Sequence, residues 1–95
     1  QTNTWYLPNN LNTAENLEVL AIENNPISYL PWNIYQLKKL RILSLRNTKI
    51  VKLPDSISEL RNLEYLDIRG TRLSKEDLEL LKALLYGVDI KSDIK

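Results

Sequence analysis

The sequence contains no cysteine, histidine, methionine or phenylalanine. Without cysteine, disulfides and thiolate metal sites are excluded. Without histidine, the chain lacks both the usual general base near neutral pH and the commonest metal ligand. We therefore predict a protein that is not an enzyme, with no catalytic residues, no cofactor and no metal site.

The charge is nearly balanced and glycine is scarce. Thirteen Lys and Arg residues stand against twelve Asp and Glu residues, which leaves a formal charge of +1. That balance supplies no long-range field for nucleic acid or an anionic membrane, and no apolar run reaches the roughly 20 residues that span a bilayer. Gly70 and Gly87 are the only glycines, so a Gly-rich phosphate loop is excluded. We expect no nucleic-acid partner and no membrane insertion.

The lack of methionine also means that Gln1 is not a translation start. We expect either a leader that was removed, as in a secreted protein, or a chain cut from a longer one. Both remain open, and a secreted, periplasmic or cell-surface location is slightly favoured over a cytoplasmic one.

What the sequence does contain is a repeat with a period of 23 residues. Residues 17–39, 40–62 and 63–85 align without gaps, and each begins L-x-x-L-x-[LI]-x-x-[NT]-x-[IL]. Residues 1–16 match the tail of a fourth unit, whereas 86–95 break the pattern. We predict one domain over 1–95, built from a partial repeat, three full repeats and a C-terminal cap at about 74–95.

Each half of the unit predicts one kind of local structure. The L-x-[LI] step has a period of two, so it predicts a short strand, and stacked units place these strands in parallel. Leu-Pro pairs at 30–31 and 53–54 predict short helical or 3₁₀ turns at 32–38 and 55–61, because proline can open a helical turn. The ninth position of each unit should bond the backbone where the strand ends; it is occupied by Asn25, Thr48 and Thr71.

The last unit departs from the Leu-Pro pattern at 76–77. Ser74 and Asp77 resemble a capping box, and leucines 78, 81, 84 and 85 share one helical face. We predict a helix from about 75 to 86, stopped near Gly87, and then a last strand-like segment with Val88 and Ile90 that covers the open core. At the other end, either Trp5, Tyr6, Leu7 and Leu11 shield the first full layer or an upstream unit does.

These units resemble the leucine-rich-repeat family across nearly the whole chain. The form LPxxIxxLxxLxxLxLxxTxI at 53–73 is similar to the Leu-Pro class of bacterial repeat proteins, Ras-pathway scaffold proteins and plant intracellular immune receptors, and LELLKALLYGVDI is most similar to the terminal unit of bacterial members. The resemblance implies a right-handed α/β solenoid with parallel strands on the concave face, helical or 3₁₀ turns on the convex face and a helix cap. It also implies protein recognition. The threonines at two of the three Asn positions make the turn ladder less regular.

In this family the partner usually meets the concave sheet. Tyr and Arg most often anchor interfaces, so Tyr65, Arg46 and Arg69 are the first choices. The alternative is a solvated face on which Asp67 simply pairs with Arg46 and Arg69. The predicted partner-binding positions, flanked by Asn24, Asn47 and Gly70, are Val19, Ala21, Glu23, Ile42, Ser44, Arg46, Tyr65, Asp67 and Arg69.

Two other groups of side chains have ordinary explanations. Tyr29, Trp32 and Tyr35 crowd one convex turn and are either a second contact patch or packing between units, which we favour. The carboxylates Asp67, Glu23 and Glu64 lie on an open face, so we read them as solvated surface and not as a catalytic pair.

Together these features predict a non-enzymatic protein-protein interaction module whose protein partner is not identified. The alternative is a structural or spacer segment that stacks end to end with further repeats or with a second copy of the chain.

Overall fold

The computed structural model describes residues 16–24, 26–30 and 32–94. The expectations for Trp5, Tyr6, Leu7, Leu11 and Asn25, and for the side chain of Trp32, lie outside this part of the chain.

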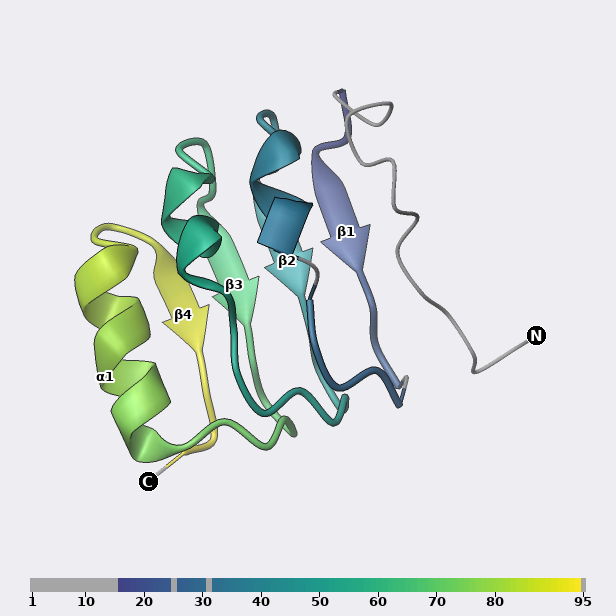
Figure 1. The fold of residues 1–95 in the computed structure, drawn as a ribbon, viewed down its shortest axis with the longest axis vertical. Helices are drawn as coiled ribbons and strands as arrows, with labels where there is room; N and C mark the ends of the chain where they lie inside the picture. Colours follow the sequence, from purple (N-terminus) through teal and green to yellow (C-terminus); the bar gives the residue numbers. More distant parts are fainter. Residues whose placement is uncertain (1–15, 25, 31, 95) are drawn as a thin grey trace.

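Four short strands form one parallel sheet in the order β1-β2-β3-β4, as Figure 1 shows. The strands are β1 (Val19–Ala21), β2 (Ile42–Ser44), β3 (Tyr65–Asp67) and β4 (Asp89–Lys91). The inward leucines pair in register, Leu20 with Leu43 and Leu43 with Leu66, each pair being 23 residues apart (43 − 20 and 66 − 43). Leu66 pairs with Ile90, which is 24 residues on (90 − 66). The longer step falls where a helix replaces the Leu-Pro turn.

Two 3₁₀ helices lie on the other side of the core, η2 (Trp32–Gln36) and η3 (Asp55–Glu59). In both, the last 3₁₀ hydrogen bond runs from the Leu37 N–H to the Ile34 carbonyl or from the Leu60 N–H to the Ile57 carbonyl, each at 3.1 Å. Both helices end two residues before the predicted limits, because the next N–H groups, those of Lys38 and Arg61, donate only two residues back, to the Gln36 and Glu59 carbonyls at 2.9 Å. Ile34 and Ile57 are fully buried. The short turns therefore anchor the convex layer by one isoleucine each.

The helix α1 (Lys75–Leu84) completes this layer. Its capping box is present as predicted: the Asp77 N–H donates to Ser74 Oγ at 3.1 Å, and the Ser74 N–H donates to Asp77 Oδ2 at 3.0 Å. The helix ends two residues earlier than predicted, because Leu85 leaves the helical conformation with ψ 54°. Gly87 follows with φ +86°, a backbone conformation that favours glycine.

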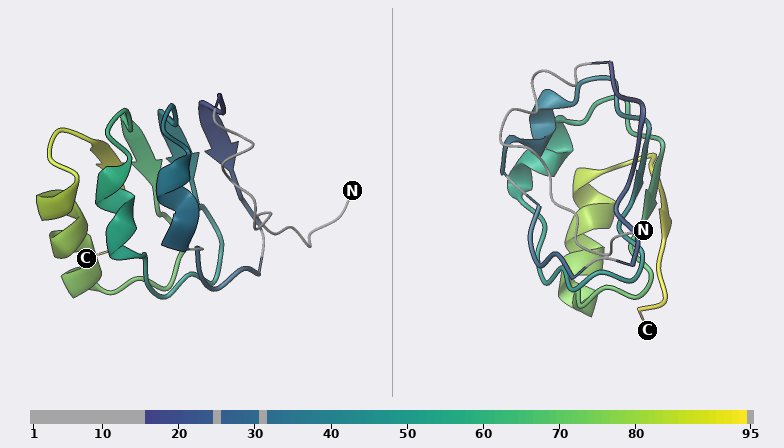
Figure 2. Two further views of the ribbon diagram at one scale, coloured as in Figure 1. Left: turned by 45° about the horizontal axis from the view of Figure 1, so that its top comes forward. Right: turned by 90° about the vertical axis from the view of Figure 1, so that its right-hand side faces the viewer.

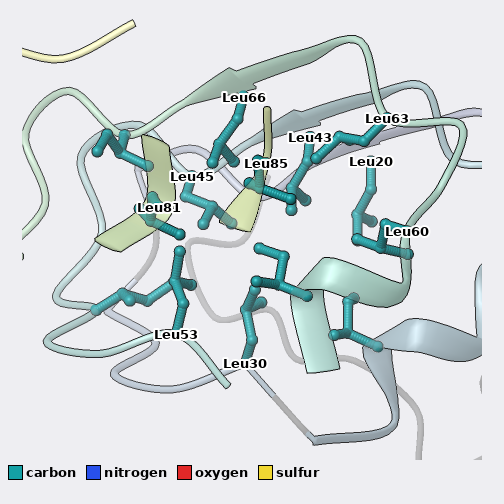
Figure 3. Close-up of a cluster of buried hydrophobic side chains, with 14 of the residues drawn as sticks. Leu20, Leu30, Leu43, Leu45, Leu53, Leu60, Leu63, Leu66, Leu81 and Leu85 are labelled. Atoms are coloured by element: carbon teal, nitrogen blue, oxygen red, sulfur yellow. The ribbon is translucent and has the colours of Figure 1, made fainter. Parts of the chain in front are cut away.

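Figure 2 shows the sheet and the convex layer facing each other, and Figure 3 shows the buried hydrophobic side chains that form the core between them. Leu20, Leu43 and Leu66 reach it from the strands, Leu81 reaches it from α1, and Leu85 reaches it from the position just after α1. Every unit thus buries its leucines against those of its neighbour, which is how a repeat protein builds a core without a single compact centre. Within the described residues, no helix combines the length and the apolar character needed to cross a membrane.

Candidate functional site

The outward side of the strands forms a face that we call the concave face. It consists of the nine predicted positions, which point away from the core because side chains alternate along a strand. Strand register places the first six in two rows of equivalent positions across the sheet. Backbone hydrogen bonds just beyond the strands, from the Asn24 N–H to the Arg46 carbonyl and from the Asn47 N–H to the Arg69 carbonyl, continue the same offset into a third row. These rows are Val19, Ile42 and Tyr65; Ala21, Ser44 and Asp67; and Glu23, Arg46 and Arg69.

The first row is apolar and accessible. Val19 is 50% exposed, and Ile42 and Tyr65 are partly exposed. The three side chains are neighbours, because Val19 pairs with Ile42 and Ile42 pairs with Tyr65 in the sheet. The row therefore presents a continuous apolar strip to solvent.

The middle row is less accessible than the sequence predicted. Ala21 is exposed, but Ser44 and Asp67 are only 7% and 3% exposed. The Ser44 hydroxyl donates to Glu23 Oε2 at 2.5 Å, and Arg69 binds the carboxylate of Asp67. Alternation correctly places both short side chains on the outward side. The alternation rule does not predict that the longer side chains of Glu23 and Arg69 cover Ser44 and Asp67. A partner would therefore have little direct contact with these two residues.

Asp67 pairs within its own repeat. The guanidinium of Arg69 donates from Nη2 to Oδ2 at 2.7 Å and from Nε to Oδ1 at 3.0 Å, and the Arg69 backbone N–H adds a third bond at 3.1 Å. These hydrogen bonds from Arg69 hold the pKa of Asp67 below its ordinary value, against the opposing effect of burial. The same carboxylate raises the pKa of Arg69.

The alternative of a solvated face expected Arg46 to pair with Asp67, and this pairing is not found among the described residues. The positive charge of Arg46 contributes to the lowered pKa of Asp67, but no ion pair joins the two side chains in the described part of the chain. Glu23, the equivalent residue one unit earlier, accepts a hydrogen bond from Ser44 instead. Arg46 is exposed, and among residues 16–24, 26–30 and 32–94 its guanidinium has no hydrogen-bond or ion-pair partner.

A row of turns holds the carboxyl ends of the strands. Asn24 and Asn47 have φ values of 56° and 58° and Gly70 has 75°, which is the left-handed region. Asn47 Nδ2 donates to Asn24 Oδ1 at 3.0 Å, and the Gly70 N–H donates to Asp93 Oδ2 at 3.1 Å. From the sequence, these residues were expected only to flank the predicted binding positions. The signal was present, because Asn, Asn and Gly recur at 23-residue spacing and tolerate positive φ best.

The ninth-position threonines behave partly as predicted. Thr48 Oγ1 donates to the Leu45 carbonyl and Thr71 Oγ1 to the Ile68 carbonyl, both at 2.8 Å. Each hydroxyl therefore satisfies a carbonyl of its own turn, where a single donor suffices.

A charged row at the start of the strands was not predicted. Arg41 Nη1 lies 3.1 Å from Glu18 Oε1, and Arg41 Nε lies 3.4 Å from Glu64 Oε2. Hydrogen bonding to Glu18, and then to Glu64, raises the pKa of Arg41. The row links three successive units, and its signal is the alternation of Glu, Arg and Glu at 23-residue spacing.

The remaining sequence candidates have separate local surroundings. Tyr29 is 66% exposed on the convex side, and Lys38 Nζ lies 5.2 Å from the centre of the Tyr35 ring. Glu23, Glu64 and Asp67 each bond a different neighbour, so they do not act as a pair. In the described residues, no cluster of three metal-ligating side chains occurs.

Comparison with known proteins identifies the architecture. The sequence profile of the leucine-rich-repeat family matches residues 15–73. The structure is similar to that of a leucine-rich-repeat protein from Leptospira interrogans, with a TM-score of 0.86 and 36% sequence identity over 90% of this chain. The match covers 22% of that bacterial protein, so the chain spans about a fifth of its length. No curated protein matches the sequence.

Proposed function

Because the chain belongs to the leucine-rich-repeat family, whose fold is typical of protein-protein interaction modules, we propose that it binds a protein partner on its concave face. The observation that carries this proposal is the accessible strip of Val19, Ile42 and Tyr65 beside Arg46, which has no ion-pair partner in the part of the chain that the structure describes. Aromatic and arginine side chains are the types that most often dominate binding energy.

The backbone beneath this strip supports the proposal. Consecutive strands pair in parallel register, and the Asn47–Asn24 hydrogen bond ties the turns at their ends. A face that is ordered before binding loses little conformational entropy when the partner arrives. The concave face is therefore suited to recognition by a preformed surface.

The proposal is of a non-enzymatic module, as is general for this family. On the concave face, the carboxylates of Glu23 and Asp67 bond Ser44 and Arg69 on an open sheet, and Glu64 at the start of the strands bonds Arg41. A catalytic pair of acids needs an enclosed site that separates their pKa values. The arrangement favours contact with a macromolecule over chemistry on a small substrate.

A comparison of two tyrosine variants tests this function. Tyr65→Ala removes an anchor from the concave face, whereas Tyr86→Ala removes a tyrosine that is 95% exposed beyond α1. We expect Tyr65→Ala to abolish recovery of a specific cross-linked partner from cells, with the melting temperature nearly unchanged, and Tyr86→Ala to retain the partner. Retention by both variants would refute binding on this face.

A structural or spacer role is the second candidate, and the partial coverage of the bacterial relative favours it. In that case β1 stacks against further repeats or against a second copy. Sedimentation of the chain over a hundredfold concentration range separates the two roles. Self-association that persists in Tyr65→Ala, with no partner recovered, would support the spacer.

A further inference from the structure

We propose that the partner presents an extended segment with one carboxylate and one nearby apolar side chain, the carboxylate binding Arg46 and the apolar group packing on Val19, Ile42 and Tyr65. This inference rests on the proposed function and specifies the chemistry of the partner. It follows from how the charges of the concave face are already paired.

Among the described residues, the acidic side chains of the neighbouring positions accept hydrogen bonds from groups other than Arg46. Glu23 accepts the Ser44 hydroxyl, and Asp67 accepts two hydrogen bonds from the side chain of Arg69. Asp93, in the same row on the far side of Arg69, accepts the Gly70 N–H. Arg46 is thus left as an exposed guanidinium without a partner in the described residues, and a guanidinium matches a carboxylate by two parallel hydrogen bonds.

The charge pattern favours one carboxylate over a polyanion. Arg69 is beside Arg46 in the same row, but its charge is neutralised by Asp67 at 2.7 Å. Arg41, at the other end of the strands, lies between Glu18 and Glu64. A nucleic-acid backbone needs several unneutralised cations in line, whereas this face offers one.

The apolar strip sets the second requirement. Val19, Ile42 and Tyr65 lie at equivalent positions across three neighbouring strands, so an inserted apolar side chain would contact two or three of them. From Ile42 to Arg46 the chain advances four residues, about 13 Å at the rise of an extended strand. An extended partner covers this distance with roughly four residues. The acidic and apolar residues of the partner should therefore stand about three to five positions apart.

A random library of 12-residue peptides displayed on phage, selected on the full 95-residue chain, tests the inference. Enriched peptides are synthesised and their affinities measured for the wild type, Arg46→Glu, Tyr65→Ala and Arg61→Glu. Arg61 is the matched control, because it is an exposed arginine outside the concave face. Thermal melting of each variant shows that it is folded.

We expect the enriched peptides to share an Asp or Glu three to five residues from an aromatic or aliphatic residue. Arg46→Glu should weaken their binding at least tenfold, Tyr65→Ala should weaken it similarly, and Arg61→Glu should leave it unchanged. Replacing the shared acid by its amide should reproduce the loss on the wild type and have little effect on Arg46→Glu.

The possible failures are distinguishable. Peptides that depend on Tyr65 but carry no acid and tolerate Arg46→Glu would overturn the carboxylate inference and leave the proposed function standing. Peptides that bind all three variants as tightly as the wild type would overturn both. A library that yields no shared sequence would overturn recognition of an extended acidic segment.

Discussion

Arg69 binds Asp67 within a single repeat, through two hydrogen bonds of 2.7 and 3.0 Å from one guanidinium to one carboxylate. The carboxylate is buried and the guanidinium is partly exposed. Arg69 therefore covers an acid that the sheet would otherwise bury without compensation, which is costly in protein interiors. It also leaves Arg46 as the cation of the same row that has no ion-pair partner among the described residues.

The first prediction concerns pH. The folded-state pKa of Asp67 lies below its ordinary value because Arg69 bonds the charged form. The ionised Asp67 carboxylate therefore stabilises the folded state fully above the unfolded-state pKa of about 3.9, and this contribution is lost as the pH falls through the lower folded-state pKa. We expect Asp67→Asn to flatten the fall in unfolding free energy below about pH 4, measured by urea unfolding from pH 2 to 7. Part of the slope should remain, because bonding to the Ser74 N–H also lowers the pKa of Asp77.

The matched control for this measurement is Glu79→Gln, which alters an exposed carboxylate on α1. Its pH profile should follow that of the wild type. An Asp67→Asn profile equal to that of Glu79→Gln would show that the Asp67–Arg69 pair does not contribute to stability.

The second prediction compares the two glycines. Both have positive φ, but a β-carbon at Gly70 would clash with Asn47 Oδ1, whereas one at Gly87 would meet nothing within 4 Å. Gly87→Ala should cost about 1 to 2 kcal/mol from the left-handed backbone alone. Gly70→Ala should cost more, because Asn47 must also move from its bond to Asn24. If urea unfolding gave the same loss of unfolding free energy for both variants, the Asn47 side chain would have moved aside without cost.

The third prediction concerns the cap of α1. Ser74→Ala removes the hydroxyl that accepts the Asp77 N–H and should lower the unfolding free energy by about 1 kcal/mol. Ser58→Ala removes a hydroxyl that donates to the Asp55 carbonyl in an exposed turn and should cost less. Amide hydrogen exchange should also accelerate in the first turn of α1 for Ser74→Ala. Unchanged exchange there would contradict a stabilising cap.

The fourth prediction tests the layered core. Leu43 is fully buried between Leu20 and Leu66, whereas Leu80 on α1 is 48% exposed. Leu43→Ala should lower the unfolding free energy by about 2 to 5 kcal/mol, the range for a buried leucine that leaves a cavity. Leu80→Ala should cost well under half of that. If urea unfolding gave similar losses of unfolding free energy for the two variants, Leu43 would not lie on the buried, inward face of the sheet.

Much of the fold could be predicted because each unit repeats the same pattern. The L-x-[LI] step correctly placed Leu20, Leu43 and Leu66 on the inward side, and the resemblance to leucine-rich repeats is confirmed. The predicted 3₁₀ turns and the predicted helix each ran two residues past the observed ends. The sequence could not show these ends, because the hydrogen-bond pattern changes there while the apolar pattern continues. The division of residues 1–95 into repeats and cap stays a prediction.

The candidate site was less predictable than the fold. Alternation identified the nine outward positions but could not show that Glu23 turns to Ser44 or that Arg69 covers Asp67. Both arginines of the row looked equivalent in the sequence. Long charged side chains reach several neighbours at similar cost, so their pairing depends on the packed geometry.

The spacing of leucines by itself determined the parallel stack and the direction in which each strand residue points, because both follow from the period of two within a strand and the constant offset between units. Only the tertiary structure decided which charges are paired and which cation is accessible. The reason is that an ion pair requires two particular side chains within about 4 Å, and that distance is set by neighbouring units folded against one another.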